Sequence, residues 1–357
     1  GMSGGVDSSV SAYLLHRQGY QVVGVFLRCF NIDGCAQRDA VDARRVAEQI
    51  GIPFYVWDFE DAYKSAVVDY MIAGYRSGIT PNPDVMCNRE IKFGLFLKKA
   101  IALGADFVAT GHYARISGAF GHRIISAGVD TRKDQSYFLW TLTPDQLNHV
   151  LFPIGRYEKP TVREIAKKAA LVTAEKKDSQ GVCFLGSFNM TDFLKQYIPC
   201  TPGPIVSVSG EVIGTHDGLS FYTIGQRHLG VDLKKTSDEH AHTIWYVSGK
   251  DIATNSLIVA PGNTHPALFT SSVFLSDLSC TTSACMNRIS TGKPMAIRAR
   301  VRYRQPLFSA TLSRLSPDRI VVSFATPQRF VAPGQSLVFY SPSTFSLWGG
   351  GVIAERF

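Results

Sequence analysis

A short glycine-rich stretch near the start of the chain, "SGGVDSSV" from Ser3 to Val10, constrains the fold more than any other feature. Two adjacent glycines let backbone N–H groups turn inward toward an anion, and the serines after them stand where a helix begins. The positive end of that helix then faces the same anion. The stretch predicts a phosphate-binding loop between a strand and a helix, and we expect residues before Gly1 to supply the strand.

Strand-like and helix-like patterns alternate over the first 115 residues or so. Apolar runs at 22–27 and 53–59 have strand length, and 106–112 reads as a strand that ends in a glycine turn. Three other stretches, which end at Ile50, Gly74 and Ile101, have apolar residues at helical spacing. This alternation predicts an α/β domain with a parallel sheet and helices on both faces, where ligands collect at the carboxyl ends of strands.

A further helix is expected at 160–171, where Thr161 and Glu164 have capping-box spacing. The sequence pattern changes near Pro199, after which glycine and proline separate short strand-like runs. We therefore predict an α/β catalytic domain over residues 1–195, a small central β-rich domain over 196–270, and a C-terminal β-barrel over 271–357.

Residues 297–305, "IRARVRYRQ", alternate apolar and basic side chains. Period two predicts a strand with Arg298, Arg300, Arg302 and Arg304 together on an outward face. Residues 271–357 carry ten Lys and Arg against three Asp and Glu, whereas the rest of the chain is nearly neutral. A basic barrel on a near-neutral body favours an acidic partner such as nucleic acid, although a solvated basic surface is the plain alternative.

The bulk composition excludes several classes of protein. The chain has 357 residues, of which 45% are hydrophobic, but no run of 18 apolar residues, so we expect no membrane span. Seven cysteines without a Cys-x-x-Cys argue against a disulfide scaffold or a structural zinc site. No signal peptide is evident, and we expect a bacterial cytoplasm, or an organelle matrix if a targeting segment was removed.

Two cysteines stand among turn-forming residues. Cys87 lies in "TPNPDVMCN", which we expect to form a stiff turn that is neither helix nor strand, and Cys183 lies in "KKDSQGVCFLG". Lys176 and Lys177 precede Cys183, and nearby cations favour the reactive thiolate. Both thiols are therefore candidate nucleophiles. The alternative is that each is a buried packing residue, which is the usual role of a free cysteine.

The chain carries an ordered set of motifs that resembles a known family. The loop has the S-G-G-x-D-S form of PP-loop ATP pyrophosphatases, which cleave ATP between the α and β phosphates and adenylate a substrate oxygen. No Walker A motif occurs. In order, "GMSGGVDSS", "TPNPDVMCN", "ATGHYAR", "KDQSYFL", "KKDSQGVCF", "YTIGQR" and "PGQS" resemble the tRNA-specific 2-thiouridylase family (MnmA/TrmU) along essentially the whole chain.

The resemblance implies ATP-dependent replacement of the C2 oxygen of the wobble uridine by sulfur. ATP, with Mg²⁺, would adenylate that oxygen, and a persulfide on Cys183 from an external donor would attack C2. Cys87 would then form a disulfide with Cys183, or instead free hydrosulfide, and Asp84 would act as general acid or base. A cysteine desulfurase or sulfur-relay protein would be a partner. The implied nucleotide-binding residues are Gly1, Met2, Ser3, Gly4, Gly5, Val6, Asp7, Ser8, Leu27 and Gly111.

The resemblance also implies tRNA contacts. They are Asn82, Pro83, Asp84, His112, Lys133, Asp134, Gln135, Arg302, Tyr303 and Gln335. For Asp84 the alternative is that it only stabilises its own turn, and for the loop 133–135 the alternative is a solvated charged turn. The chain departs from the family pattern at Phe30, where relatives often have tryptophan. We treat Cys29 and Cys35 nearby as incidental, because two thiols alone make a poor zinc site.

Two other functions compete with this one. A PP-loop amide ligase related to GMP or argininosuccinate synthetases would use the same loop without needing a thiol pair. A non-catalytic RNA-binding protein with a vestigial nucleotide site would keep the basic barrel and release no AMP or pyrophosphate.

Overall fold

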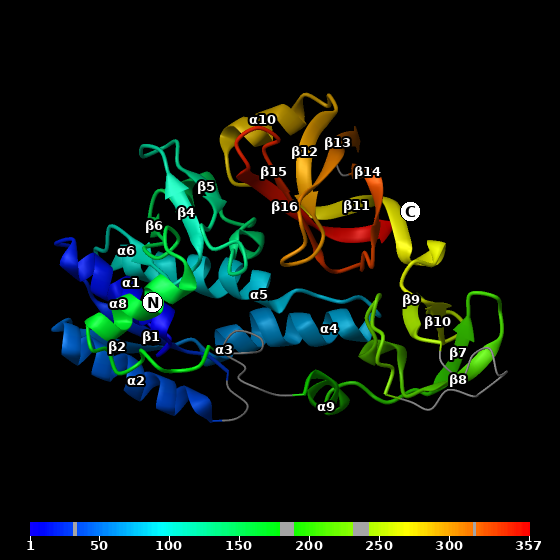
Figure 1. The fold of residues 1–357 in the computed structure, drawn as a ribbon, viewed down its shortest axis with the longest axis horizontal. Helices are drawn as coiled ribbons and strands as arrows, with labels where there is room; N and C mark the ends of the chain where they lie inside the picture. The colour runs from blue at the N-terminus through cyan, green and yellow to red at the C-terminus, as the bar shows by residue number, and fades with distance from the viewer. Residues whose placement is uncertain (31–33, 179–188, 231–242, 317–318) are drawn as a thin grey trace.

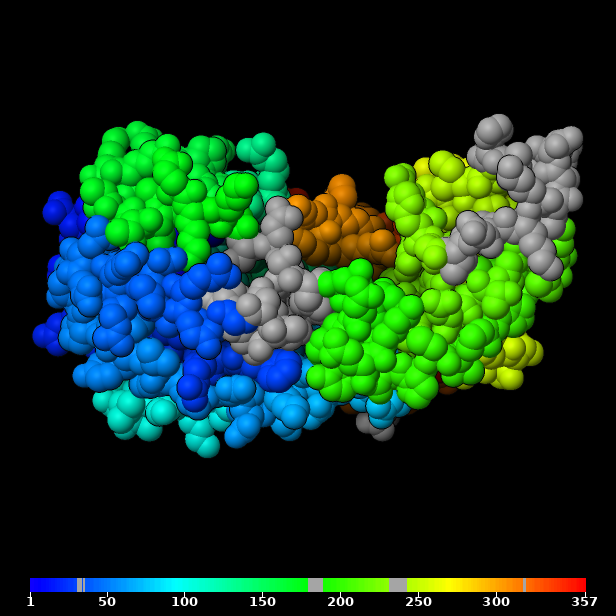
Figure 2. All heavy atoms as spheres, turned by 90° about the horizontal axis from the view of Figure 1, so that it is seen from below, coloured from blue at the N-terminus to red at the C-terminus, as the bar shows by residue number. Residues whose placement is uncertain are grey.

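The structure is a computed structural model that describes residues 1–30, 34–178, 189–230, 243–316 and 319–357. An α/β domain occupies one end, a small sheet occupies the other, and a β-barrel lies between them along the long axis (Figure 1). From below, the blue α/β domain and the yellow-green small sheet lie at opposite ends of the long axis, with orange barrel atoms visible between them (Figure 2). In the described ranges, no helix is long and apolar enough to cross a membrane.

Parallel strands form the centre of the α/β domain. The pairs are β1 (Gly24–Arg28) with β2 (Phe54–Asp58) and β3 (Val108–Ala109) with β6 (Val150–Leu151). The Met2 N–H donates to the Val25 carbonyl at 2.8 Å, and the Gly1 amine donates to the Ala109 carbonyl at 2.8 Å. Residues 1–2 therefore lie between β1 and β3, where a strand leading into the glycine loop belongs. The predicted parallel sheet is confirmed.

Helices cover both faces of this sheet, as the alternation along β1 shows. Phe26 packs into one apolar cluster with α1, α2 and α8, whereas its neighbours Val25 and Leu27 pack into another. Period-two alternation of a strand buried on both faces produces this division. The helices of the first cluster are α1 (Val6–Arg17), α2 (Cys35–Ile50) and α8 (Lys159–Lys168). Those of the second are α3 (Glu60–Tyr63), η1 (Lys64–Asp69), α4 (Tyr70–Arg76), α5 (Pro83–Met86), η2 (Cys87–Phe96) and α6 (Leu97–Ala102).

Two sequence predictions for these helices are wrong. The stretch around Cys87 contains the short helix α5, which runs directly into η2, because proline is tolerated in a first helical turn and Asn82 caps it by accepting the Val85 N–H at 3.3 Å. The capping box expected at Thr161 and Glu164 does not form, because α8 begins two residues before Thr161 with Glu158 as N-cap. A capping box occurs instead at α7 (Pro144–Leu147).

The C-terminal barrel is closed by six strands. The order is β11 (Phe269–Cys280), β14 (Arg319–Arg329), β13 (Phe308–Ser316), β12 (Met295–Arg300), β15 (Ser336–Tyr340) and β16 (Ser346–Arg356), and β16 pairs back with β11. The helix α10 (Ser283–Ser290) follows β11. A hairpin of the α/β domain, β4 (Ala114–Ser117) and β5 (Ile124–Ala127), extends the same sheet, because β5 pairs with β16. The barrel is therefore joined to the α/β domain by backbone hydrogen bonds.

A four-stranded sheet forms the central part. Its strands are β7 (Gly203–Ser207), β8 (Val212–His216), β9 (Trp245–Asp251) and β10 (Ser256–Pro261), in the order β8-β7-β10-β9. Short elements complete the fold: η3 (Ser136–Phe138), α9 (Met190–Lys195), η4 (Leu219–Phe221) and η6 (Pro266–Leu268). One apolar core contains Cys87, Trp245 and Tyr340, so all three parts pack together. The domain boundaries after residues 195 and 270 stay predictions.

The predicted row of four arginines on one strand face is wrong. The strand β12 ends at Arg300, and Arg304 has a positive φ of 64°, so the alternation stops halfway. Arg300 is buried and pairs with the buried Asp134 of the α/β domain at 3.2 Å. Arg302 is half-buried and donates to the carbonyls of Phe330 and Ile224. These guanidiniums join parts of the fold because each lies beside acceptors of another segment.

Asp134→Asn tests the buried ion pair. The amide leaves the Arg300 charge buried without its counter-charge, and removal of one partner of such a pair costs about 3–5 kcal/mol. We expect the free energy of unfolding, measured by urea titration, to fall by that amount. Asp217→Asn is the control, because Asp217 pairs with Lys195 on the surface and the loss should stay below about 1 kcal/mol. Equal losses in the two variants would contradict the role of burial.

Candidate active site

The glycine loop has the geometry of a phosphate nest. Gly4 has a φ of +71°, and a Cβ there would lie 2.2 Å from the Asp39 carbonyl oxygen, so only glycine fits. Gly5 is the N-cap of α1 and offers no side chain to its free N–H groups. The Ser8 hydroxyl donates to the Gly5 carbonyl at 3.0 Å and accepts the Ser3 N–H at 3.1 Å. These bonds hold the loop in shape while the helix end stays open for an anion.

Gly111 brings the end of β3 against this loop. A Cβ at Gly111 would lie 2.8 Å from the Ser8 nitrogen, so the close approach depends on the missing side chain. Leu27, near the end of β1, and Met2, which leads into the loop, are both buried. The structure therefore gathers the predicted nucleotide-binding residues at the carboxyl edge of the sheet, although their contacts with a nucleotide stay predictions.

A buried lysine, which the sequence interpretation missed, anchors the carboxylate of the loop. Lys159 donates to both oxygens of Asp7 at 2.8 Å and lies 2.8 Å from Asp178. The Tyr113 hydroxyl also donates to Asp7, at 2.7 Å. Burial and the neighbouring Asp7 carboxylate raise the pKa of Tyr113, so its hydroxyl remains a donor. The sequence held one sign of this pairing. Lys159 is the first residue of a helix, where a positive charge is unfavourable beside the helix dipole unless an acidic partner lies nearby.

Asp178 gathers three cations beside the loop. Its carboxylate lies 2.7 Å from Lys133, 2.8 Å from Lys159 and 2.7 Å from Arg163. Burial works to raise the pKa of Asp178, but hydrogen bonds from Lys133 and Lys159 outweigh it and lower the pKa to about 2. Asp178 directly precedes residues 179–188, which contain Cys183 and lie outside the described residues.

The cations expected to activate Cys183 are only partly free to do so. Lys176 donates to Asp39 at 2.7 Å and to Asp42 at 2.5 Å, both on α2. Its charge is therefore engaged with two carboxylates rather than directed at a thiol. The thiol of Cys35 also lies outside the described residues.

All three parts of the fold converge on the segment that leads to Cys87. From the barrel, the Gln335 amide donates to the carbonyls of Thr80 and Pro81 at 2.9 and 3.2 Å, and Thr80 donates its N–H to Pro333 at 2.9 Å. From the central part, Thr223 accepts the Thr80 hydroxyl at 3.2 Å. Gln335, predicted to contact tRNA, thus fixes this segment.

Cys87 is completely buried at the junction of α5 and η2. Burial raises the pKa of its thiol to about 12, with smaller contributions from Cys29 and Asp84, while Lys92 acts in the opposite direction. In this structure Cys87 is therefore a buried packing residue with a protonated thiol. Asp84 precedes Cys87 by three residues on one continuous helical stretch, which places both side chains on a common face. Asn82 and Pro83 at the start of α5 are buried.

The remaining predicted tRNA contacts make internal contacts. His112 is buried against the rings of Phe93 and Phe152, and its Nδ1 lies 2.7 Å from the Thr110 hydroxyl. Burial, reinforced by Lys92, lowers the pKa of His112 well below its usual value, so the ring is neutral. The ring of Tyr303 rests on that of Phe138, at 4.6 Å between centroids.

The loop of residues 133–135 links the barrel to the glycine loop. Asp134 accepts the N–H groups of Gly128 and Ser136 at 3.1 and 3.0 Å in addition to its pairing with the barrel. Gln135 accepts the Tyr113 N–H at 3.0 Å through its side chain. Asp134 is therefore turned into the protein, and a tRNA contact for these residues stays a prediction.

Comparisons with known proteins agree along the chain. Residues 1–187 match the family model described as the tRNA methyl transferase HUP domain, residues 191–261 its PRC-barrel domain, and residues 277–353 the aminomethyltransferase beta-barrel domain. The chain is 48% identical over 362 residues to the tRNA-specific 2-thiouridylase MnmA of Stutzerimonas stutzeri, covering 99% of this chain and 93% of that protein. It is 46% identical to the protein of that name from Tolumonas auensis, with 100% and 96% covered. The Listeria monocytogenes relative is 47% identical, with 99% and 93% covered.

A glycine nest at the carboxyl edge of a parallel sheet, followed by a small β domain and a barrel, defines a PP-loop α/β protein with two further β domains. Three domain matches in order and near-complete coverage of the relatives make the assignment specific. The chain belongs to the tRNA-specific 2-thiouridylase family.

Asp178→Asn tests the cluster beside the glycine loop. Because the folded pKa lies near 2, below the ordinary value of 3.8, the wild-type carboxylate stabilises the fold above about pH 4 and loses this effect as the pH falls through 2. We expect the variant to be less stable at pH 7 and to lose less stability between pH 4 and 2, measured by urea unfolding at each pH. Asp145→Asn, on the surface, is the control. Parallel pH profiles for wild type and D178N would contradict the assignment.

Thiol labelling tests the protected state of Cys87. Only thiolate reacts with iodoacetamide, so a buried thiol with a pKa of about 12 reacts slowly at pH 8. We expect the exposed Cys200 to be labelled at least about 100-fold faster, measured by peptide mass spectrometry over time. Comparable rates would show that Cys87 is accessible in the resting protein.

Proposed function

We propose that this chain is a tRNA 2-thiouridylase that replaces the C2 oxygen of the wobble uridine with sulfur and converts ATP to AMP and pyrophosphate. The observation that carries this proposal is the open phosphate nest of Gly4 and Gly5, in a chain that aligns end to end with 2-thiouridylases. The family-model description mentions methyl transfer, but methyl transfer does not account for a phosphate nest held beside a lysine and carboxylate cluster.

ATP is consumed in this reaction as a substrate, with Mg²⁺ bound to its phosphates. The N–H groups of Gly5 and of the first turn of α1 suit the phosphates, and Leu27 gives an apolar wall for the adenine. Lys159 donates to both oxygens of Asp7, so this carboxylate keeps one position beside the loop. The chemistry that ATP supplies is the conversion of a poor leaving group, the C2 oxygen, into a good one.

The barrel supports the assignment of tRNA as the other substrate. Its excess of seven positive charges attracts a polyanion, and Arg304 is exposed beside Tyr303. The wobble base would reach Asn82, Pro83 and Asp84 at the start of α5. On this proposal Arg302 and Gln335 act largely by holding the parts together, because their donors already bond to carbonyls.

Sulfur arrives as the terminal atom of a persulfide on Cys183, delivered by a cysteine desulfurase or a sulfur-relay protein. That sulfur forms a bond to C2 as AMP departs with the former C2 oxygen. The Cys87 sulfur then attacks the Cys183 sulfur, which breaks the S–S bond, releases the thiolated base and leaves a Cys87–Cys183 disulfide. An external dithiol reduces this disulfide. Asp84, on the helical face of Cys87, is placed to take the thiol proton.

The same two cysteines admit a second route. Cys87 attacks the Cys183 persulfide first and frees hydrosulfide, which then attacks C2. Both routes consume one persulfide and end with the same disulfide. They differ in the order of attack and in the nucleophile that reaches C2, which is the persulfide in the first route and hydrosulfide in the second.

A reconstituted reaction tests the function. Purified protein is incubated with tRNA transcript, ATP, Mg²⁺ and a persulfide donor, and 2-thiouridine and AMP are measured by mass spectrometry. We expect Cys87→Ala and Cys183→Ala each to lower 2-thiouridine by more than about 100-fold, because each removes a nucleophile, whereas AMP formation persists. Cys200→Ala is the matched control and should retain activity.

Four outcomes would contradict the proposal. Full thiolation by both cysteine variants would rule out the two-cysteine route, and AMP formation by the wild type without any 2-thiouridine would favour an amide-ligase type of PP-loop enzyme. Absence of AMP from the wild type would favour a non-catalytic RNA-binding protein. Wild-type AMP formation that does not depend on tRNA would separate nucleotide cleavage from tRNA modification.

A further inference from the structure

Two thiols of the barrel lie against each other, and the proposed sulfur transfer uses neither. The Sγ atoms of Cys280 and Cys285 are 2.9 Å apart, and both side chains are buried. This separation exceeds a disulfide bond length of about 2.0 Å by only about 0.9 Å. Both cysteines are free in the structure.

The backbone fixes both cysteines in this arrangement. Cys280 is the last residue of β11 and pairs with Gly349 of β16. Cys285 is in the first turn of α10, where its N–H donates to the Thr282 hydroxyl at 3.2 Å. Between them, the buried Thr281 donates its hydroxyl to the Leu347 carbonyl at 2.6 Å. A loop anchored at both ends keeps the sulfurs together.

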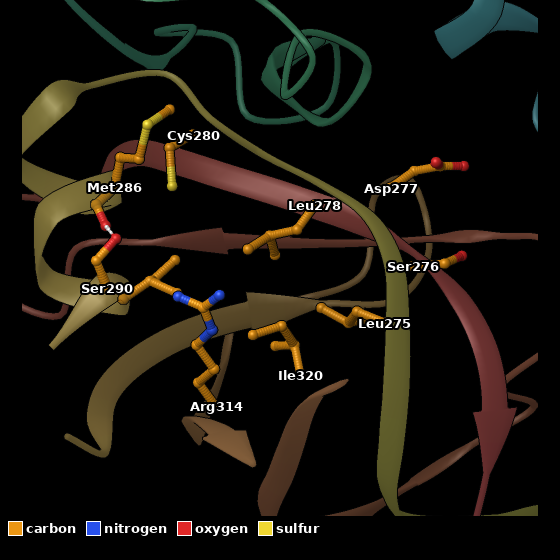
Figure 3. A pocket seen from close by; sticks show the side chains of 10 residues that line it. Leu275, Ser276, Asp277, Leu278, Cys280, Met286, Ser290, Arg314 and Ile320 are labelled. Atoms are coloured by element: carbon orange, nitrogen blue, oxygen red, sulfur yellow. Dashed lines mark hydrogen bonds between the residues drawn. The ribbon is translucent and has the colours of Figure 1, made fainter. Parts of the chain in front are cut away.

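Only Cys280 of the pair faces open space. It lines a cavity of about 430 Å³ between α10 and the barrel strands (Figure 3). The figure shows its sulfur directed into the space bounded by Met286, Leu278 and Arg314. Such a volume admits a small molecule, so the otherwise buried Cys280 thiol has a route to a small reagent.

We propose that Cys280 and Cys285 form an oxidation site that closes to an intramolecular disulfide when a hydroperoxide enters the cavity. The Cys280 thiolate attacks the peroxide oxygen, the O–O bond breaks, and Cys280 becomes a sulfenic acid. The Cys285 sulfur then attacks the Cys280 sulfur, the S–O bond breaks, and water leaves with the Cys285 proton. For hydrogen peroxide, two thiols and one peroxide give one disulfide and two waters.

The division of roles between the two cysteines follows from their surroundings. Cys280 lines the cavity whereas Cys285 does not, so Cys280 meets the peroxide first. The hydrogen bond with Cys280, together with burial, raises the pKa of Cys285. Cys285 is then the resolving thiol, which captures the sulfenic acid before further oxidation. The reaction should accelerate as the pH rises, since the thiolate is the nucleophile.

The disulfide would lock α10 onto the end of β11. That strand end pairs with β16, which in turn pairs with β5 of the α/β domain. Oxidation should therefore stabilise the barrel against unfolding. We expect the midpoint of thermal unfolding to rise on oxidation of the wild type and not of the Cys285→Ala variant.

Mass spectrometry of one tryptic peptide tests the site. Residues 251–288 contain no internal Lys or Arg and only two cysteines, Cys280 and Cys285, so the readout is independent of Cys87 and Cys183. Full-length protein is treated with hydrogen peroxide at pH 7 and pH 9, blocked with iodoacetamide and digested. We expect the peptide to lose two hydrogens, take up no label, and recover both labels after dithiothreitol, with faster conversion at pH 9.

Two control variants keep the test decisive. Cys200→Ala should behave as the wild type, because Cys200 is exposed and outside the pair. Cys285→Ala should give sulfinic or sulfonic acid on Cys280, because no resolving thiol remains. Met286 sulfoxide appears as an added oxygen and is counted separately. A wild-type peptide that stays doubly labelled, or that carries irreversible oxidation on Cys280 as fast as C285A, would overturn the proposal.

Discussion

The ion pair between Asp134 and Arg300 is the contact on which the rest of the arrangement depends. It places a charge of the barrel inside the α/β domain, where low solvent access makes loss of either partner costly. Asp134 also fixes the position of Gln135, which bonds to Tyr113. Tyr113 in turn donates to Asp7 in the glycine loop. The loop of residues 134–135 thus connects the barrel to the phosphate nest through one ion pair and two hydrogen bonds.

The segment leading to Cys87 is also held by contacts from other parts of the fold. Thr80 bonds to the barrel through Pro333 and Gln335 and to the central part through Thr223. On the proposed function, tRNA is aligned on the barrel and on the α/β domain at once, and this segment is anchored from both of the other parts. The barrel and the central part therefore both help to set the position of α5.

Local patterns in the sequence predicted the sheet, the helices on both faces, the glycine loop and the barrel strands, because each depends on residues close in the chain. The ion pair of Lys159 with Asp7 could not be found this way, since the two lie 152 positions apart. The arginine row failed for a related reason: alternation fixes a face, but the buried acceptor for Arg300 comes from another domain. At Asn82, two prolines and turn residues concealed a helix start, because the same residue types favour both.

The burial of Cys87 changes how the proposed chemistry is best understood. A thiol with a pKa of about 12 is a poor nucleophile at neutral pH, so on the proposed mechanism Cys87 attacks a persulfide only slowly in the resting protein. On the proposed mechanism, the wobble base contacts Asn82 to Asp84, and these residues open the same helical stretch that carries Cys87. Because Asn82 caps that helix, a base that engages its side chain competes with the cap at 3.3 Å. Base binding and release of the thiol would then draw on one structural element, which couples nucleophile exposure to the presence of substrate.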